Sequence, residues 1–316
     1  MNDEALVNSG RVAKAKIATR RILIYVAITF AITWTMWIAC GLATGSFQTG
    51  MAASAIMIGV TSIGMFVPLI GALLTNVIVG KENRMDLAFR PRIRCNVKSY
   101  LLAWFVPTVI SLAGAVVFFV AFPGLLDVGA EMFVTAAQPA IDAGQIQADA
   151  VPAILASQIV FAIVLAPFIN MIPAFGEEAG WRGMLFPSLC ERTSQRNAVL
   201  ITGVIWGVWH APITCMGHNY GFAYFGFPIT GILSMIVFCT ALGSCLAWLR
   251  LRTQSVWPCA LAHGAINAIA GVGVYFCTIG ATLLGPSPAG LVGGIPLLIL
   301  GVWCWLQMSA ENPYTQ

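Results

Sequence analysis

The sequence predicts an all-α integral membrane protein, a bundle of about eight transmembrane helices with both termini in the cytoplasm and a kinked or broken fourth helix. Of its 316 residues, 59% are apolar and only 9% are charged, and the mean hydropathy is +0.86. An average soluble domain is about a quarter charged. The composition therefore excludes a soluble globular enzyme and a nucleic-acid-binding domain.

Long uncharged apolar runs recur along the whole chain. A helix needs about 20 apolar residues to cross the hydrocarbon core, and every run except the marginal fifth meets that length. None of the runs alternates as a transmembrane barrel strand does. The runs are Ile22–Leu42, Ala53–Val79, Tyr100–Phe122, Val151–Ala174, Asn197–Ile213, Phe227–Leu249, Val256–Thr278 and Gly290–Met308.

The basic residues support this plan because they occur only in every second connection. All 16 Lys and Arg residues precede the first run or follow the second, fourth or sixth, and the positive-inside rule then places both termini in the cytoplasm. Pro123–Ala150 carries acidic residues without a base, so we expect an outer loop. The first run is longer than a signal peptide requires, which favours a retained anchor.

The plan divides the chain into four segments. Residues 1–21 are a cytoplasmic N-terminal segment, and residues 22–150 hold the first three transmembrane helices with the acidic outer loop. Residues 151–278 form a core that carries the polar motifs described next, and residues 279–316 hold the last transmembrane helix and a C-terminal tail. The nine cysteines form no C-x-x-C pair, so we interpret them as small packing residues.

Ionisable groups inside a bilayer cost roughly 2.5–3.5 kcal/mol each and are usually functional. Most of the runs contain none, and the polar groups that do occur form three clusters. They are Glu177, Glu178 and Arg182 after the fourth run, Trp206 and His210 on the fifth, and His263 and Asn267 on the seventh. A further histidine, His218, falls in an outer connection and is interpreted as incidental.

Each cluster has helical spacing. Glu178 and Arg182 are four residues apart, so they share a helix face and can pair. Glu177 is rotated by about 100° from Glu178 and can face a cavity. His263 and Asn267 project side by side from one face for the same reason.

The clusters also fall at similar depths. Glu177 and His210 each lie about 20 Å of helix from the cytoplasmic end of their segments, provided that the chain stays in the membrane as far as Cys190. His263 lies about 16 Å from its own end. We therefore predict that the three clusters surround one cavity.

This depth has a geometric consequence for the fourth helix. As one helix, Val151–Cys190 would be about 60 Å long, which is too long for a single crossing. We therefore expect a kink or break at Pro167 or Pro173.

Two kinds of chemistry fit these groups. A carboxylate and an imidazole can together take a proton from water, while an imidazole and a carboxamide can donate hydrogen bonds to a developing oxyanion. Alternatively, Glu177, His210 and His263 could hold a divalent metal such as Zn²⁺, which accepts histidine nitrogen and carboxylate oxygen. Either arrangement suits hydrolysis of an amide bond inside a membrane.

The three clusters resemble the motifs of a known family. E-E-A-G-W-R-G, which begins at Glu177, resembles the E-E-x-x-x-R motif of the CPBP (Abi) family, the intramembrane proteases similar to the type II CAAX prenyl endopeptidases. Trp206-x-x-x-His210 resembles the second motif of that family, and His263-x-x-x-Asn267 resembles the third. The motifs occur in the family's order, and residues 1–150 add little to the resemblance.

The resemblance implies a catalytic residue set, within a catalytic core at residues 151–278. It implies that Glu177 activates water with His210 as partner, that His263 and Asn267 stabilise the oxyanion, and that Glu178, Arg182 and Trp206 support them. The implied substrate is a membrane-associated protein or peptide, cleaved near its C-terminus in eukaryotic members. Metal dependence stays open, and in a bacterium the location would be the plasma (inner) membrane.

Two other functions remain as alternatives. A proton-coupled membrane transporter also uses intramembrane carboxylates, as parts of a proton relay. A non-catalytic bacteriocin-immunity or scaffold protein of the same fold is the second alternative. In every case the expected partners include the lipid bilayer and no nucleic acid.

Overall fold

The computed structural model describes residues 3–279 and 282–311. In these residues the chain is helical, with one isolated bridge between Leu126 and Cys277, so the all-α membrane fold class is confirmed. The remaining positions of the predicted terminal segments, 1–2, 280–281 and 312–316, lie outside the described residues.

A helix occupies each of the eight predicted runs. The longer helices are α1 (Asp3–Thr44), α3 (Ala55–Gly64), α4 (Val67–Ile78), α5 (Ile93–Ala121), α7 (Val151–Val164), α8 (Ala166–Gly180), α10 (Gln195–Trp209), α12 (Ile229–Thr253), α13 (Trp257–Ile269) and α15 (Ile295–Leu306). The connections hold α2 (Ser46–Thr49), η1 (Met51–Ala53), η2 (Lys81–Asn83), η3 (Pro123–Leu125), α6 (Glu131–Asp142), η4 (Ala148–Ala150), η5 (Trp181–Leu185), α9 (Phe186–Cys190), α11 (Ala211–Thr214) and α14 (Val272–Tyr275).

Not every helix is long enough to span a membrane by itself. Within the described residues, five spans are long and apolar enough, and the bent pair formed by α7 and α8–α9 gives a sixth. The other two predicted spans are shorter, because α10 has 15 residues and α15 has 12. The chain is an integral membrane protein, while the membrane sides of its termini stay a prediction.

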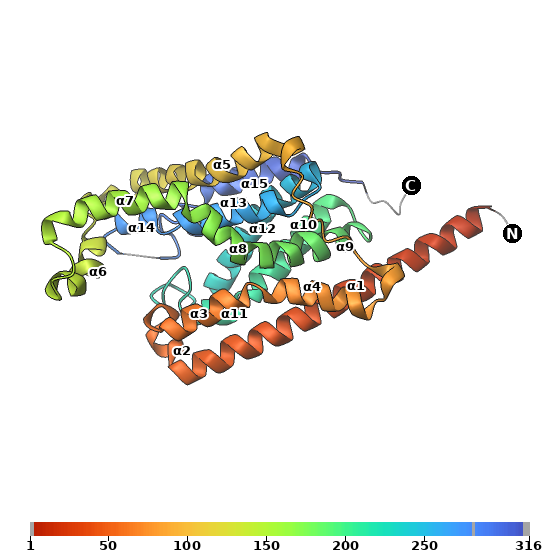
Figure 1. Cartoon of the computed structure of the whole chain (residues 1–316), viewed down its shortest axis with the longest axis horizontal. Coiled ribbons are helices and arrows are strands. Elements are labelled where there is room, and N and C mark those ends of the chain that lie inside the picture. The colour runs from red at the N-terminus through yellow and green to blue at the C-terminus, as the bar shows by residue number, and fades with distance from the viewer. Residues whose placement is uncertain (1–2, 280–281, 312–316) are drawn as a thin grey trace.

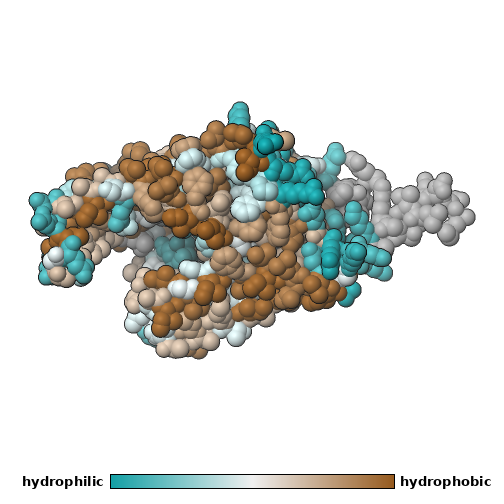
Figure 2. All heavy atoms as spheres, in the orientation of Figure 1, coloured by the Kyte–Doolittle hydropathy of each residue, from teal (hydrophilic) through white to brown (hydrophobic). Residues whose placement is uncertain are grey.

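The distribution of hydrophilic and apolar atoms on the surface is also that of a membrane protein. Hydrophilic atoms gather at the end of the molecule where α1 begins and at the tip formed by α6 and α7, with apolar surface between them (Figure 2). The start of α1 and the end of α15 lie at the same end of the bundle (Figure 1). An apolar band between two polar ends is what a bilayer requires of a helical protein.

Two connections differ from the sequence-based expectation. The segment expected to precede the first span is the beginning of α1, which runs without interruption from Asp3. The acidic connection contains the helix α6, and the Asp127 carboxylate accepts hydrogen bonds from the backbone N–H groups of Gly129 (2.9 Å) and Glu131 (2.6 Å) at its start. The bond from Glu131 satisfies the N–H group of the first helical residue, which has no partner within the helix.

The expected break in the fourth helix is present. The two parts are bent by 50°, and the break falls at Leu165, between α7 and α8. Pro167 lies in the first turn of α8, where its missing N–H costs nothing. The other candidate, Pro173, lies inside α8.

The helices that carry the motifs lie at the centre of the bundle, with α1, α3 and α4 on one side and α5 and α15 on the other (Figure 1). Glycines allow this close packing. A Cβ at Gly264 of α13 would lie 2.6 Å from the backbone of α8, and one at Gly207 of α10 would lie 2.4 Å from Ile236 Cα of α12. The motif helices α8, α10 and α13 can therefore bring their polar side chains together.

Candidate active site

One cavity of about 250 Å³ receives side chains from all three motifs. Glu177 from α8, His210 from the end of α10, and His263 and Asn267 from α13 all line it, together with Trp206. Hydrophilic atoms are visible in a hollow of the surface between α14 and the connection that follows α11 (Figure 2). The structure thus brings together the four residues that the sequence marks as catalytic candidates.

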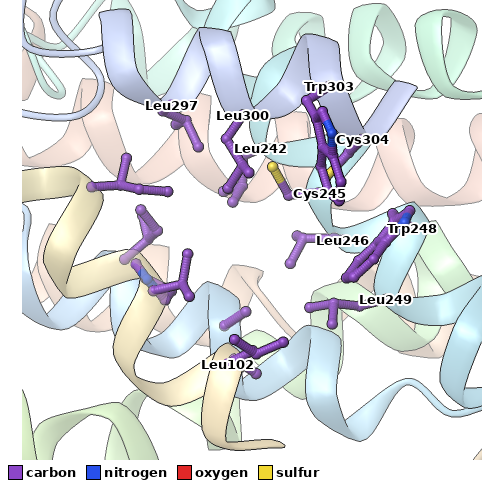
Figure 3. Close-up of a pocket in the computed structure, with 16 residues that line it drawn as sticks. Leu102, Leu242, Cys245, Leu246, Trp248, Leu249, Leu297, Leu300, Trp303 and Cys304 are labelled. Atoms are coloured by element: carbon purple, nitrogen blue, oxygen red, sulfur yellow. The ribbon is translucent and has the colours of Figure 1, made fainter. Parts of the chain in front are cut away.

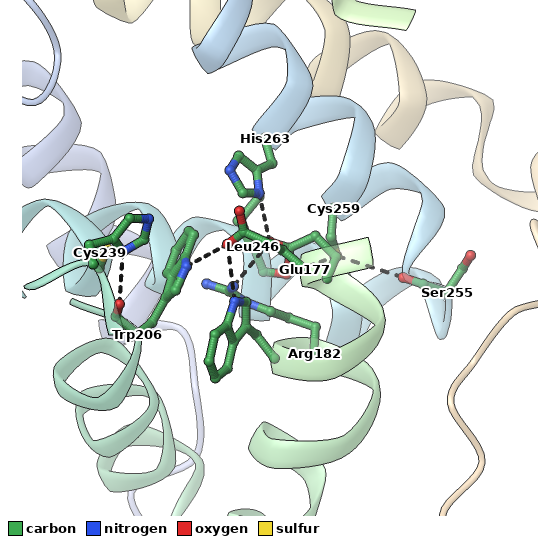
Figure 4. Close-up of polar contacts among 11 residues, drawn as sticks. Glu177, Arg182, Trp206, Cys239, Leu246, Ser255, Cys259 and His263 are labelled. Carbon is green, nitrogen blue, oxygen red and sulfur yellow. Dashed lines mark hydrogen bonds and ion pairs between the residues drawn. The ribbon is translucent and has the colours of Figure 1, made fainter. Parts of the chain in front are cut away.

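The Glu177 carboxylate is held by two indole groups. Its Oε2 accepts hydrogen bonds from Trp181 Nε1 at 3.1 Å and from Trp206 Nε1 at 2.7 Å (Figure 4). The side chain is only 2% exposed, so these donors offset part of the cost of removing the carboxylate from water. With Oε2 engaged twice, Oε1 is the oxygen left for a water or substrate in the cavity.

The neighbouring Glu178 is fully buried and pairs with two groups. Arg182 Nη1 lies 3.1 Å from Glu178 Oε1, as the four-residue spacing predicts, and His263 Nδ1 lies 3.0 Å from the same oxygen. The Arg182 guanidinium also lies over the Trp206 ring, 4.4 Å from its centroid. Because an ionised carboxylate only accepts hydrogen bonds, His263 donates from Nδ1 and its Nε2 is left for the cavity.

His210 ends α10, directly before α11 with its Pro212. Its Nδ1 lies 2.8 Å from the Trp206 carbonyl oxygen, which can only accept. The Nδ1 therefore carries the proton, and Nε2 keeps a lone pair that can accept a proton or a hydrogen bond. Cys239 of α12 lies behind the ring, with Sγ 3.8 Å from Nδ1.

The π-helix η5 follows the two glutamates directly. Such single-turn π segments inside α-helices often occur at functional sites. Trp181 and Arg182, its first residues, are the partners of Glu177 and Glu178 respectively. The wider turn thus begins at the two residues that hold the paired carboxylates.

His218 corrects the sequence-based interpretation. It lines the same cavity, and its ring lies nearly parallel to that of His210, with a 4° angle and 6.4 Å between centroids. Gly217 (φ 81°) and Asn219 (φ 65°) on either side have left-handed backbone, which turns the chain back toward the bundle. A Gly and an Asn flanking a polar residue are a turn signal that was available in the sequence.

From the sequence alone, none of the first 150 residues was expected to contribute to the site. Trp37 of α1, with Thr61 and Met65 from α3 and the turn after it, form one wall of the cavity. Within the described residues, Trp37 Nε1 and Thr61 Oγ1 are buried without a hydrogen-bond partner. No motif or hydropathy signal in the sequence marks these two residues as part of the site.

The metal alternative can be tested against the donor atoms. Each Nδ1 of His210 and His263 already has a partner, as does Glu177 Oε2, so only the two Nε2 atoms and Glu177 Oε1 remain as possible ligands. Among the described residues, no three His, Cys, Asp or Glu side chains come together in a way that could hold a metal ion. The residues present therefore do not fit the three-ligand zinc site of a catalytic metal centre, and we derive no step through a metal.

Comparison with known proteins shows what the core is similar to. Residues 156–269 match the family described as Type II CAAX prenyl endopeptidase Rce1-like. The chain is also 30% identical over 101 residues to CAAX prenyl protease 2 of Methanococcus maripaludis, a match that covers 32% of this chain and 37% of that protein. The chain therefore spans little more than a third of the length of the curated relative that it matches.

The matched segment is a membrane-embedded helical core with all three motifs, and it excludes the wall that α1 and α3 contribute. Residues 156–269 are therefore similar to the type II CAAX prenyl endopeptidases. This similarity confirms the resemblance of the three motifs to those of the CPBP family.

Proposed function

We propose that this protein is an intramembrane endopeptidase that hydrolyses a peptide bond of a membrane-associated protein or peptide. The observation that carries the proposal is the cavity shared by Glu177, His210, His263 and Asn267. The matched family and the name of the archaeal relative support cleavage near the C-terminus of the substrate. In a bacterium, the enzyme would act in the plasma (inner) membrane.

In the first step, a water molecule is held between Glu177 Oε1 and His210 Nε2. Glu177 takes a proton from this water as its oxygen attacks the carbonyl carbon of the scissile peptide bond. His210 accepts a hydrogen bond from the water through Nε2, because its Nδ1 proton is engaged by the Trp206 carbonyl. This engagement fixes the tautomer in which Nε2 can polarise the water.

In the second step, the oxyanion of the tetrahedral intermediate is stabilised by hydrogen bonds. The Asn267 carboxamide donates one, and His263 in its protonated form donates another from Nε2, since its Nδ1 is bound to Glu178. The intermediate then collapses, the carbon–nitrogen bond breaks, and the proton held by Glu177 moves to the leaving nitrogen. The carboxylate is thereby regenerated.

The experiment uses the purified full-length protein in liposomes with membrane-bound C-terminal peptides, both prenylated and unmodified. Cleavage by the wild type and its loss in Glu177→Gln would support the proposal. As matched control, Glu131→Gln removes an acidic group of α6 at the polar tip, and it should cleave as the wild type does. Full cleavage by Glu177→Gln, or solute transport driven by a proton gradient without cleavage, would contradict the proposal.

A further inference from the structure

A second cavity of about 250 Å³ lies between α5, α12, α13 and α15 (Figure 3). No charged side chain, hydroxyl or carboxamide is found among the described residues that line it. Leu102 of α5 and Trp303 of α15 are part of its lining and are 37% and 47% exposed. The cavity is therefore open to the outer surface of the bundle, which faces hydrocarbon in a membrane.

The cavity lies toward the end of the bundle where the basic residues are. Trp248 of α12 lines it and contacts Trp303 of α15, with ring centroids 5.6 Å apart. One turn further along α12, the Arg252 guanidinium lies over the Trp248 ring, 4.8 Å from its centroid. An exposed cation thus lies directly beside an aromatic residue of the cavity wall.

A second cation lies on α5. Lys98 is exposed and is four residues before Leu102, so the two share a helix face. The start of α5 is held beside the end of α12, because Asn96 Nδ2 donates to the Thr253 carbonyl oxygen at 3.3 Å. Lys98 lies two residues after Asn96, and Arg252 lies directly before Thr253. The two cations therefore flank the same end of the cavity.

We propose that this cavity binds an acyl chain of an anionic phospholipid, with the phosphate between Lys98 and Arg252. The apolar lining suits a hydrocarbon chain and offers nothing to a polar ligand. The two cations lie where the interface of the basic side would be, and anionic headgroups are attracted to basic residues there. Charge complementarity at one end and a wholly apolar lining thus point to a single occupant.

The headgroup provides the selectivity. A chain that leaves the bilayer for the cavity stays in an apolar environment, so its transfer gains little from the hydrophobic effect. Each basic residue near an anionic headgroup contributes about fivefold in affinity. Lipids with identical chains should therefore be distinguished by the charge of their headgroups.

The site is separate from the proposed peptidase cavity but adjoins it. Ile266 of α13 lines both cavities, and it lies between His263 and Asn267 along the helix. A bound acyl chain would pack on a face of α13 that is adjacent to the face carrying the catalytic candidates. The lipid site itself does not depend on the proposed enzymatic activity.

The test measures lipid binding by native mass spectrometry. Delipidated full-length protein in detergent is mixed with equal amounts of phosphatidylglycerol and phosphatidylcholine that carry the same chains. We expect preferential retention of phosphatidylglycerol, and a loss of about fivefold in its affinity in each of Lys98→Gln and Arg252→Gln. Lys81→Gln removes an exposed base from η2 and is the matched control, with no expected change.

A second pair of variants tests the chain-binding part. Val106→Phe fills the cavity from α5 and should lower the retention of both lipids. Val109→Phe adds the same ring to the same helix at a position that is 64% exposed, and should not. Three outcomes would each overturn the proposal. The wild type could retain the two lipids equally, or Lys81→Gln could lose as much affinity as Arg252→Gln. The third is equal lipid retention by Val106→Phe and Val109→Phe. None of these readouts requires cleavage of a peptide, so they do not test the proposed function.

Discussion

Trp206 Nε1 donates a hydrogen bond to Glu177 Oε2 at 2.7 Å, and this contact joins α10 to α8. The carbonyl oxygen of the same tryptophan accepts from His210 Nδ1. One residue thus positions both the proposed base and its imidazole partner. The ring also lies beneath the Arg182 guanidinium, so Trp206 contacts members of both the proposed catalytic and the proposed supporting groups.

Trp206→Phe removes the indole N–H and keeps an aromatic ring at this position. We expect cleavage to fall about 10- to 100-fold, because a hydrogen bond to a charged group contributes about 1.5–3 kcal/mol, while the remaining ring keeps its place over Arg182. The measurement is kcat and KM in liposomes, with the loss expected in kcat. Trp305→Phe, which removes an indole donor to the Arg196 carbonyl oxygen, is the control. Equal rates for Trp206→Phe and the wild type would refute the positioning role.

Glu177→Gln keeps the shape of the side chain and removes the base. General acid–base catalysis typically contributes about 10²–10⁴-fold, so single-turnover cleavage should fall by that order while peptide binding is retained. Binding is measured separately by the anisotropy of a fluorescent peptide. Loss of binding together with cleavage would show that the residue holds the substrate rather than the water.

Arg182→Ala should lower stability as well as activity. It leaves the Glu178 carboxylate buried without its guanidinium partner, which typically costs about 3–5 kcal/mol. The expected result is a lower yield of monodisperse protein and a lower Tm. The double variant Glu178→Gln with Arg182→Leu removes both charges, and we expect it to regain part of the lost Tm. A double variant as unstable as the sum of its single variants would contradict the pairing.

Asn267 is exposed within the cavity wall, so its substitution should affect chemistry rather than folding. Loss of an oxyanion donor typically costs about 10²–10³-fold in kcat. We expect that loss in Asn267→Ala, and one at least as large in Asn267→Asp, whose negative charge would oppose the oxyanion. The Tm should stay near the wild-type value in both. A fully active Asn267→Asp would exclude the carboxamide from the oxyanion site.

His218 gives a prediction about pH. Burial lowers its pKa to about 4, whereas an unfolded histidine has a pKa of about 6.5. Between these values the unfolded state binds more protons, so this residue lowers stability as the pH falls through that window. The Tm of the wild type relative to His218→Gln should therefore decrease from pH 7 to pH 5. His210, whose ring faces His218, is present in both proteins. A constant Tm difference would show that His218 does not titrate in this range.

The sequence predicted the helices and the polar clusters well, because both depend on local properties. Apolar length determines where a chain can enter a bilayer, and the four-residue spacing placed Glu178 beside Arg182 before any tertiary contact was known. The break in the fourth helix followed from length alone, although it falls at Leu165, before Pro167.

The missed features depend on long-range packing. Trp37 and Thr61 reach the cavity because α1 and α3 pack beside the motif helices, and no pattern within those segments encodes that neighbour. The helix α6 was missed because its acidic ends, Glu131 and Asp142, and its internal Pro139 are as typical of a solvated loop as of a surface helix. The role of Glu178 in orienting His263 was missed because the two residues are 85 positions apart, so that only tertiary packing brings them together.

The wall that Trp37 and Thr61 build shapes the cavity without supplying the groups of the proposed chemistry. It lies outside the segment that matches the family, whereas Glu177, His210, His263 and Asn267 lie inside it. The Trp37 ring also packs on Trp209 of α10, with the ring centroids 4.6 Å apart, so α1 supports the helix that carries His210. Conservative substitutions at Thr61 would therefore change the fit of a bound peptide and leave all four proposed catalytic side chains in the cavity.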